Sequence, residues 1–405
     1  MNKKFSLAIA GALLLAFANL GCSNGETSED SSVKNINVVY AIASVDNIVA
    51  TLEICKDDSP TLFYQGRDIC DLQAMPKNVV ATGSTSGTVD TIKNEISLMH
   101  NLYPEAKFTL YLNDLWFGTL PIGFFENQGI EDYEVILITD GGGSYGATFS
   151  QFDTIEEYEA VDISEYENSS GLLVDVNHTK YCMKLALEKQ KYKWFVQFPE
   201  FLKEYTKDEE IKSLLDKGIA ENKIVKYDIQ KNYDSLSAAQ KNAFKKAMRY
   251  DQKEYTELFT LDEGKKGMMI VGGSDSAMGS GKYQVLIEKL IQEFGAEKYS
   301  YYFKPHPSWP PEKLSAHNGK SALDFFKEKE IKTIPAALPS DVTMVIYADS
   351  FDCGGYYGST FMTVPEKTVK FFFNNKDVID TATKPLDKMF EHQLLDADKI
   401  VWIVE

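Results

Sequence analysis

A lysine, and two residues later a histidine that stands between two prolines, are the residues of this chain best placed to do chemistry. Residues 299–303 are apolar and aromatic, as in a buried strand, and they are followed by Lys304, Pro305, His306 and Pro307. Because proline fixes φ and tends to end regular structure, the strand should stop there. In an open α/β sheet, ligands bind at the carboxyl ends of the strands. An ammonium and an imidazole at that edge indicate an anionic ligand, most simply a phosphate.

A carboxylate follows a second predicted strand. Residues 135–138 are rich in Ile and Leu, and Thr139, Asp140 and three glycines come next. Asp140 is therefore placed to act as a general base, and the glycines let a ligand approach the backbone closely. A capping Asp in a simple turn is the alternative. Residues 142–146 have the letters of a hydrolase nucleophile elbow, but the Asp140-Gly141 pair ends the strand too early for a serine hydrolase.

Two further glycine-containing segments are candidate binding loops. Ser359 and Thr360 follow a predicted glycine-rich turn at residues 353–358. Exposed backbone N–H groups with two hydroxyls are suited to an anion, although a plain helix cap is the alternative. Gly272 and Ser274 come directly after a predicted strand. They are candidates for contact with a nucleotide or a sugar, or they form a connecting loop.

The elements that would position these residues alternate between strands and helices. Strands are predicted at residues 36–42, 78–82, 107–112 and 133–139, with a helix at 89–102, and again at 267–271, 299–303, 332–335, 369–373 and 400–404, with a helix at 283–294. Helical periodicity dominates between the two groups, at residues 185–198, 208–220 and 237–258. Such alternation predicts βαβ units and parallel sheets. We therefore expect an α/β protein with two Rossmann-like domains that face a central cleft.

The amino terminus has the features of an export signal. Two lysines precede an apolar stretch at residues 5–17, which is too short to span a bilayer, and Cys22 follows Gly21. This pattern resembles a bacterial lipoprotein signal, with residues 1–21 removed and lipid attached to Cys22. An ordinary secretory signal is the alternative. The prediction is an exported lipoprotein of the bacterial cell envelope that is held to a membrane only through Cys22.

The rest of the chain divides into four predicted parts. Residues 22–34 begin with the lipidated cysteine and form a polar, disordered tether. Residues 35–262 form an amino-terminal Rossmann-like domain with a helical extension, and residues 263–397 form the carboxy-terminal domain. Residues 398–405 supply a closing strand.

Composition limits the partners of the protein. Its 405 residues carry a formal net charge of −18, which argues against nucleic acid because a phosphate backbone requires a basic face. An anionic ligand must therefore be held by a local cationic pocket. Cysteines and histidines nowhere have the spacing of a zinc site, so no metal is predicted. Cys55 and Cys70 are close enough in sequence to form a disulfide in an exported protein, and the sequence leaves that pairing open.

Taken in order along the chain, these sites resemble the motifs of bacterial sialyltransferases of glycosyltransferase family 80, the marine-bacterial and Pasteurella-type enzymes. The family's Asp-Asp-Gly motif is similar to residues 139–141, and its Lys-Gly-His-Pro motif is similar to residues 304–307. Its Ser-Ser pair is similar to residues 358–359, and its Ile-Pro-Ala segment with a following Glu is similar to residues 334–336 with Asp341. The resemblance extends from about residue 36 to the carboxyl end.

The resemblance implies a GT-B fold and an inverting transfer of sialic acid from CMP-sialic acid to a hydroxyl of a terminal, galactoside-type sugar of a glycan or glycolipid. It implies no metal cofactor. The carboxy-terminal domain would bind the nucleotide sugar, and the amino-terminal domain would bind the acceptor. The implied roles are general base for Asp140, stabilisation of the CMP phosphate for His306 and Ser359, and ribose binding for Asp341. The other donor-side candidates are Lys304 on the cytidine side, Thr360, Gly272 and Ser274.

The chain departs from the family pattern mainly on the acceptor side. Thr139 and Gly358 stand where the family has an Asp and a Ser, and Trp116 stands where it has a His. The acceptor-stacking Trp of the family is replaced near Ser276. The donor class is therefore better supported than the acceptor. Asn113 and Trp116 are the acceptor-side candidates, and a buried core tryptophan is the alternative for Trp116.

Three other functions compete with a sialyltransferase. The first is transfer of a related nine-carbon acid from a nucleotide by the same fold. The second is a solute-binding lipoprotein, because such proteins also have two α/β lobes and a tether but need no base. The third is a chain that binds CMP and has lost catalysis.

Overall fold

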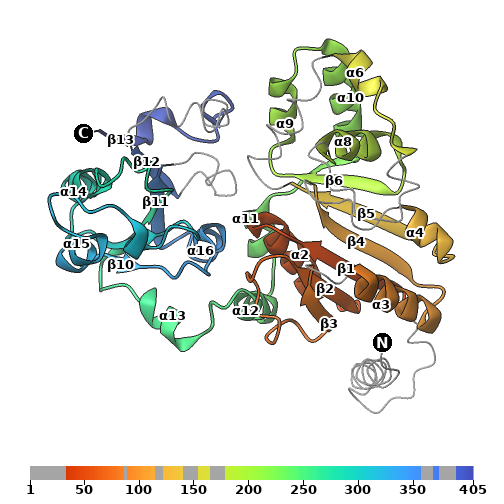
Figure 1. The fold of residues 1–405 in the computed structure, drawn as a ribbon, viewed down its shortest axis with the longest axis horizontal. Coiled ribbons are helices and arrows are strands. Elements are labelled where there is room, and N and C mark those ends of the chain that lie inside the picture. The colour runs from red at the N-terminus through yellow and green to blue at the C-terminus, as the bar shows by residue number, and fades with distance from the viewer. Residues whose placement is uncertain are drawn as a thin grey trace.

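Two parallel sheets, each flanked by helices, make up the protein (Figure 1). The computed structural model describes residues 33–85, 89–114, 122–139, 154–164, 178–356, 368–373 and 389–404. Within these residues no helix is long and apolar enough to cross a bilayer. The two sheets confirm the expected α/β class with two Rossmann-like domains.

The first sheet has seven strands in the order β3-β2-β1-β4-β5-β6-β7, and every neighbouring pair is parallel. Its strands are β1 (Asn35–Ala41), β2 (Thr61–Gln65), β3 (Val79–Ser84), β4 (Lys107–Asn113), β5 (Tyr133–Ile138), β6 (Tyr192–Val196) and β7 (Ile224–Lys226). Strands β1, β2, β4 and β5 are buried along almost their whole length, as is typical of a parallel sheet covered on both faces.

Helices cover the faces of this sheet and continue into a helical extension. They are α2 (Ser44–Lys56), α3 (Val89–Leu102), α4 (Ile122–Asn127), α6 (Ile155–Glu159), α8 (His178–Glu188), α9 (Pro199–Leu202), the 3₁₀ turn η2 (Lys203–Tyr205), α10 (Glu209–Ala220), α11 (Ile229–Asp234), α12 (Ala238–Ala247) and α13 (Lys253–Leu258). Helix α12 starts with the expected capping box, in which Ser237 accepts from the Gln240 N–H and Gln240 accepts from the Ser237 N–H.

The second sheet has six parallel strands in the order β10-β9-β8-β11-β12-β13. They are β8 (Lys266–Val271), β9 (Tyr299–Lys304), β10 (Lys332–Thr333), β11 (Phe351–Gly355), β12 (Val369–Phe373) and β13 (Val401–Ile403). The helical elements of this domain are α14 (Tyr283–Phe294), α15 (Ala322–Glu328), α16 (Ser340–Ile346) and the 3₁₀ turns η3 (Pro311–Lys313) and η5 (Ala397–Lys399). Strand β9 ends at Lys304, as the prolines predicted.

Two helix assignments made from the sequence are wrong. The helix predicted at residues 185–198 ends at Glu188, and Tyr192–Val196 forms β6 in the interior of the first sheet. Its side chains alternate between buried and half-buried, which is the period of a strand. The helix predicted at residues 237–258 is broken between α12 and α13, where Arg249 has a φ of 69°.

The glycine-rich turn predicted to begin at Cys353 is also wrong for its first part. Gly354 and Gly355 lie inside β11, with Gly355 paired to Val271 of β8. A Cβ at Gly355 would lie 2.2 Å from the Val271 carbonyl oxygen. Close approach of neighbouring backbones therefore explains these two glycines.

The two domains meet through α16. This helix contacts α2 and α11 of the first domain, and buried residues from both domains form one hydrophobic core. A second connection is made near the carboxyl end of the chain, where the His392 Nε2 lies 3.3 Å from Glu204 Oε1 and its ring packs on Phe201.

Candidate active site

Lys304 is buried where β9 ends, and only 3% of it is exposed. Its Nζ donates to the carbonyl oxygens of Pro305 at 2.8 Å and Ala336 at 3.3 Å. Burial lowers the pKa of Lys304 to about 8, and the carboxylate of Asp341 opposes that shift. The ammonium therefore ties the end of β9 to the segment after β10, and the charge of Asp341 favours its protonated form.

His306 lies two residues further on and is exposed. Its Nδ1 accepts a hydrogen bond from the backbone N–H of Ser308 at 3.2 Å, so the proton of the neutral ring is on Nε2. Burial, the charge of Lys304 and the charge of Arg67 lower the pKa of His306. At neutral pH the ring is therefore a neutral donor through Nε2–H.

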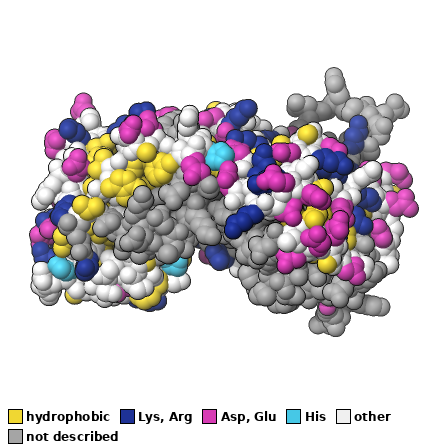
Figure 2. Space-filling model, turned by 90° about the horizontal axis from the view of Figure 1, so that it is seen from above, with side chains coloured by type: hydrophobic (Ala, Val, Ile, Leu, Met, Phe, Trp, Pro, Cys, Tyr) yellow, Lys and Arg dark blue, Asp and Glu magenta, His cyan; other side chains and the backbone are white. Residues whose placement is uncertain are grey.

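Arg67 is a candidate site residue that the sequence did not reveal. It follows β2 in the first domain and is exposed, and its charge acts on His306 of the second domain. Residues just after the carboxyl ends of β2 and β9 are therefore close enough for their charges to interact. Figure 2 shows acidic and basic side chains interspersed on the face of the first domain that carries α6, α9 and α10, in a chain with a formal net charge of −18.

Asp341 lies in the first turn of α16 and is half-buried. Its charge acts on Lys304, and the charge of Lys304 acts in turn on His306. Asp341, Lys304, His306 and Arg67 thus form one electrostatically connected group that spans both domains. Three of its four members were singled out from the sequence.

Gly272 and Ser274 have structural contacts of their own. The Gly272 N–H donates to the Lys304 carbonyl at 2.9 Å, and a Cβ at Gly272 would lie 2.6 Å from the Phe303 ring. Ser274 Oγ accepts from the Ala277 N–H at 3.3 Å and so closes the turn after β8. Both residues support the carboxyl edge of the second sheet, and their contact with a donor stays a prediction.

The matching edge of the first sheet is lined by buried polar side chains. Asn113 ends β4 close to Asp46, which accepts from three backbone N–H groups at the start of α2. Burial raises the pKa of Asp46 to about 6. Asp114 accepts from Trp194 Nε1 at 3.0 Å. Asn113 is fully buried, and its proposed role in acceptor binding stays a prediction.

Thr139 fixes the end of β5 in this network. It is fully buried, and its Oγ1 donates to Oε1 of Gln197 at the end of β6. Asp140 is the next residue and lies outside the described residues, as do Trp116, Ser359, Thr360 and Cys22. Their roles therefore stay predictions.

The described cysteines form no disulfide, and the described residues hold no candidate metal site. Cys55, Cys70, Cys182 and Cys353 are free and buried, so the structure has no Cys55–Cys70 disulfide. In the part of the chain that the structure describes, no three His, Cys, Asp or Glu side chains are grouped so that they could hold a metal ion.

Two doubly wound parallel domains, with cationic and acidic side chains where their strands end and the domains meet, define the GT-B class of fold. Solved bacterial sialyltransferases share it. The α/β-galactoside α-2,3-sialyltransferase of Photobacterium phosphoreum matches with a TM-score of 0.67 and 16% identity, covering 91% of this chain and 99% of that one. The GT-B domain of the Photobacterium damselae sialyltransferase matches with a TM-score of 0.64 and 14% identity, over 92% and 100% of the two chains.

A third structure was solved with ligands. The 2,6-sialyltransferase of Photobacterium sp. JT-ISH-224, in a ternary complex with CMP and lactose, matches with a TM-score of 0.62 and 13% identity, covering 91% of this chain and 78% of that one. No family model and no curated protein matches the sequence. The expected resemblance to bacterial sialyltransferases is therefore confirmed through the fold.

Proposed function

We propose that the protein is an inverting glycosyltransferase that moves sialic acid from CMP-sialic acid to a hydroxyl of a terminal, galactoside-type sugar. One observation carries the proposal. His306, Lys304 and Arg67 bring positive charge and a neutral N–H donor to the junction of the two domains, in a fold shared with sialyltransferases, one of which was solved with CMP and lactose.

The proposed reaction forms one bond and breaks one. The acceptor hydroxyl oxygen attacks the anomeric carbon of sialic acid, and its proton passes to the carboxylate of Asp140. The bond from that carbon to the phosphate oxygen breaks, and the bonding electrons leave with CMP. Inversion follows from a single displacement.

The leaving group gains negative charge on its phosphate. The Nε2–H of His306 donates to that phosphate, and the hydroxyls of Ser359 and Thr360 add further donors. Asp341 accepts hydrogen bonds from the ribose hydroxyls. Lys304, whose Nζ already donates to two backbone carbonyls, acts by holding the end of β9 and through its charge. No step uses a metal ion, so we expect activity to survive EDTA.

Calorimetry separates this function from a solute-binding lipoprotein. The protein lacking residues 1–22 is titrated with CMP and, separately, with free sialic acid. We expect CMP to bind, to bind more weakly to Asp341→Asn, and to bind unchanged to Asp140→Asn, because Asp140 faces the acceptor. Binding of free sialic acid without any binding of CMP would favour the solute-binding alternative and refute the proposal.

The place of the protein in the cell is part of the same proposal. The signal at residues 1–21 and lipid on Cys22 would anchor the transferase in the bacterial cell envelope, with residues 23–34 as its tether. Metabolic labelling with a fatty acid tests this directly. Label should enter the wild-type chain and not Cys22→Ser.

A further inference from the structure

Four consecutive residues, 247–250, connect a loop of the first domain to α16 of the second, and we call them the strut. They run from Ala247, the last residue of α12, into the segment before α13. The first three contact the loop at residues 66–71, which comes directly after β2 and carries Arg67. The fourth, Tyr250, contacts α16, which carries Asp341.

The loop at residues 66–71 is held on both sides. Within the first domain, the Gln65 side chain accepts from the N–H groups of Ile69 and Cys70 at 3.1 and 2.8 Å and donates to the Cys70 carbonyl at 2.9 Å. The Gly66 N–H donates to the carbonyl of Ala41 at 2.7 Å. Arg67 therefore projects from a loop whose backbone is fixed by hydrogen bonds.

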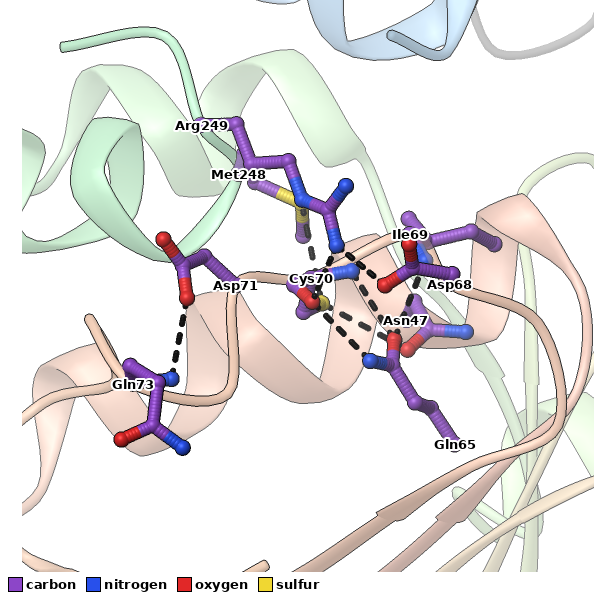
Figure 3. A network of polar contacts seen from close by, with 9 residues as sticks. All are labelled: Asn47, Gln65, Asp68, Ile69, Cys70, Asp71, Gln73, Met248 and Arg249. Carbon is purple, nitrogen blue, oxygen red and sulfur yellow. Dashed lines mark hydrogen bonds and ion pairs between the residues drawn. The ribbon is translucent and has the colours of Figure 1, made fainter. Parts of the chain in front are cut away.

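The strut holds the same loop from the opposite side (Figure 3). The Asp71 N–H donates to the Ala247 carbonyl at 2.7 Å, and the Met248 sulfur lies 3.9 Å from the Cys70 sulfur. Arg249 pairs with Asp68 and donates from Nη2 to the Cys70 carbonyl at 3.2 Å. These contacts engage the loop directly beside Arg67.

Arg249 makes these contacts from a left-handed backbone conformation, which is unfavourable for residues other than glycine. The N–H of Tyr250 donates to the Lys245 carbonyl and that of Arg249 donates to the Lys246 carbonyl, which is the Schellman pattern that ends α12. The residue at the Arg249 position of this pattern is left-handed and is usually glycine, and Arg249 has a φ of 69°. Arg249 therefore stands where glycine is usual, and its side chain reaches Asp68 from this backbone.

Tyr250 makes the connection to the second domain. Only 2% of it is exposed, and its hydroxyl donates to the Pro339 carbonyl at 2.9 Å and lies 2.6 Å from Thr343 Oγ1. Pro339 is the N-cap of α16, so this bond fixes the turn of the helix that contains Asp341. Burial raises the pKa of Tyr250, and the phenol stays a protonated donor.

We propose that Arg249 and Tyr250 are positioning residues that set the loop at residues 66–71 and helix α16 relative to each other. The inference rests on the proposed function for the ligand, CMP, but its geometry does not depend on it. Through the strut, Arg67 is held opposite His306 while Asp341 is held at the proposed ribose position. Neither Arg249 nor Tyr250 contacts the substrate in this account.

An NMR titration of His306 tests whether Arg249 positions the loop at residues 66–71, and it needs no ligand. In Arg249→Gly the left-handed backbone is retained and the side chain is lost. Because Arg67 lowers the pKa of His306, removing the Arg249 contacts to Asp68 and to the Cys70 carbonyl should let Arg67 move and raise that pKa in an NMR titration of the histidine rings. His306→Gln identifies the signal. Asn222→Gly is the matched control, since Asn222 also has a positive φ, of 58°, and lies outside the strut. An unchanged His306 titration in Arg249→Gly would overturn the proposal.

Calorimetry with CMP tests whether Tyr250 positions helix α16. Tyr250→Phe should weaken CMP binding about two- to ten-fold, the range expected for one lost hydrogen bond. The Thr343 hydroxyl still donates to the Pro339 carbonyl at 3.2 Å, so α16 keeps its first turn. Tyr301→Phe also loses a phenol-to-carbonyl bond in this domain, to Gly295 at 3.4 Å, and should bind CMP normally. Equal affinities in the two variants would contradict a positioning role for Tyr250. If wild type binds no CMP, the proposed function fails. The histidine titration still tests whether Arg249 positions the loop at residues 66–71.

Discussion

Replacing Lys304 with methionine should change how the stability of the protein depends on pH. Burial lowers the Lys304 pKa from 10.5 to about 8, and each pKa unit is worth about 1.36 kcal/mol, so protonating this amine costs the folded protein about 3.4 kcal/mol relative to the unfolded chain. Methionine has a similar volume and no charge. It also leaves the carbonyls of Pro305 and Ala336 without this donor, so the pH dependence is more informative than the stability at one pH.

The direction of the pH dependence follows from the number of protons that Lys304 binds in the folded and unfolded states. Between pH 8 and pH 10.5 the unfolded chain holds a proton on Lys304 and the folded protein does not, so the contribution of Lys304 rises with pH. It is complete above the unfolded pKa and is lost as the pH falls through about 8. From pH 7 to pH 10, wild type should therefore gain about 2.5 kcal/mol in its free energy of unfolding relative to Lys304→Met.

Urea titrations at pH 7, 8, 9 and 10, at constant ionic strength and followed by circular dichroism, measure this difference. The matched control is Lys298→Met, because the side chain of Lys298 just before β9 is 71% exposed. Its difference from wild type should stay flat. A flat difference for Lys304→Met as well would refute the argument that the buried ammonium is held at the expense of folding free energy.

Three further substitutions test the packing and the charges around the domain junction. Gly355→Ala places a Cβ 2.2 Å from the Val271 carbonyl oxygen, so thermal denaturation should show a loss of about 1–3 kcal/mol or more in the free energy of unfolding. Gly83→Ala is the control and should lose less, because its Cβ would meet only the Tyr64 ring, at 3.1 Å. Trp194→Phe removes the indole donor to the buried Asp114 and should cost about 1–3 kcal/mol by urea denaturation, and an unchanged midpoint would show that this bond is dispensable. Arg67→Ala should raise the pKa of His306 in an NMR titration, whereas a pKa that stays put would mean that the two charges do not face each other.

Local patterns predicted β8, α14 and β9 of the second domain well, but they missed β11 in the interior of its sheet. The aromatic run of β9, its end at Lys304 and the helix that precedes it all follow from burial, proline chemistry and helical periodicity, which act within a few residues. The ordered motifs also predicted the GT-B fold. The misassigned β6 shows the limit of this approach, because its strand form depends on pairing with β5 and β7, which the local pattern of residues 192–196 does not show.

Contacts between the domains could not be predicted. Arg67 lies in a short loop that matches no motif, and only the folded chain brings its charge to His306. Tyr250 carries no local signal either, since its partners belong to α16. The glycines of β11 were predicted to form a turn with exposed backbone N–H groups. Gly355 is instead explained by the backbone of β8 beside it, which the sequence does not show.

Release of CMP from CMP-sialic acid, measured with the protein lacking residues 1–22 in the presence and absence of a panel of galactosides, tests the proposed transfer most directly. The account predicts release that depends on an acceptor, survives EDTA, and falls by about 10²–10³ in His306→Ala and at least as far in Asp140→Ala. Acceptor-independent release that persists in Asp140→Ala would contradict the assigned base. No release with any acceptor, together with no binding of CMP, would contradict the proposed function itself.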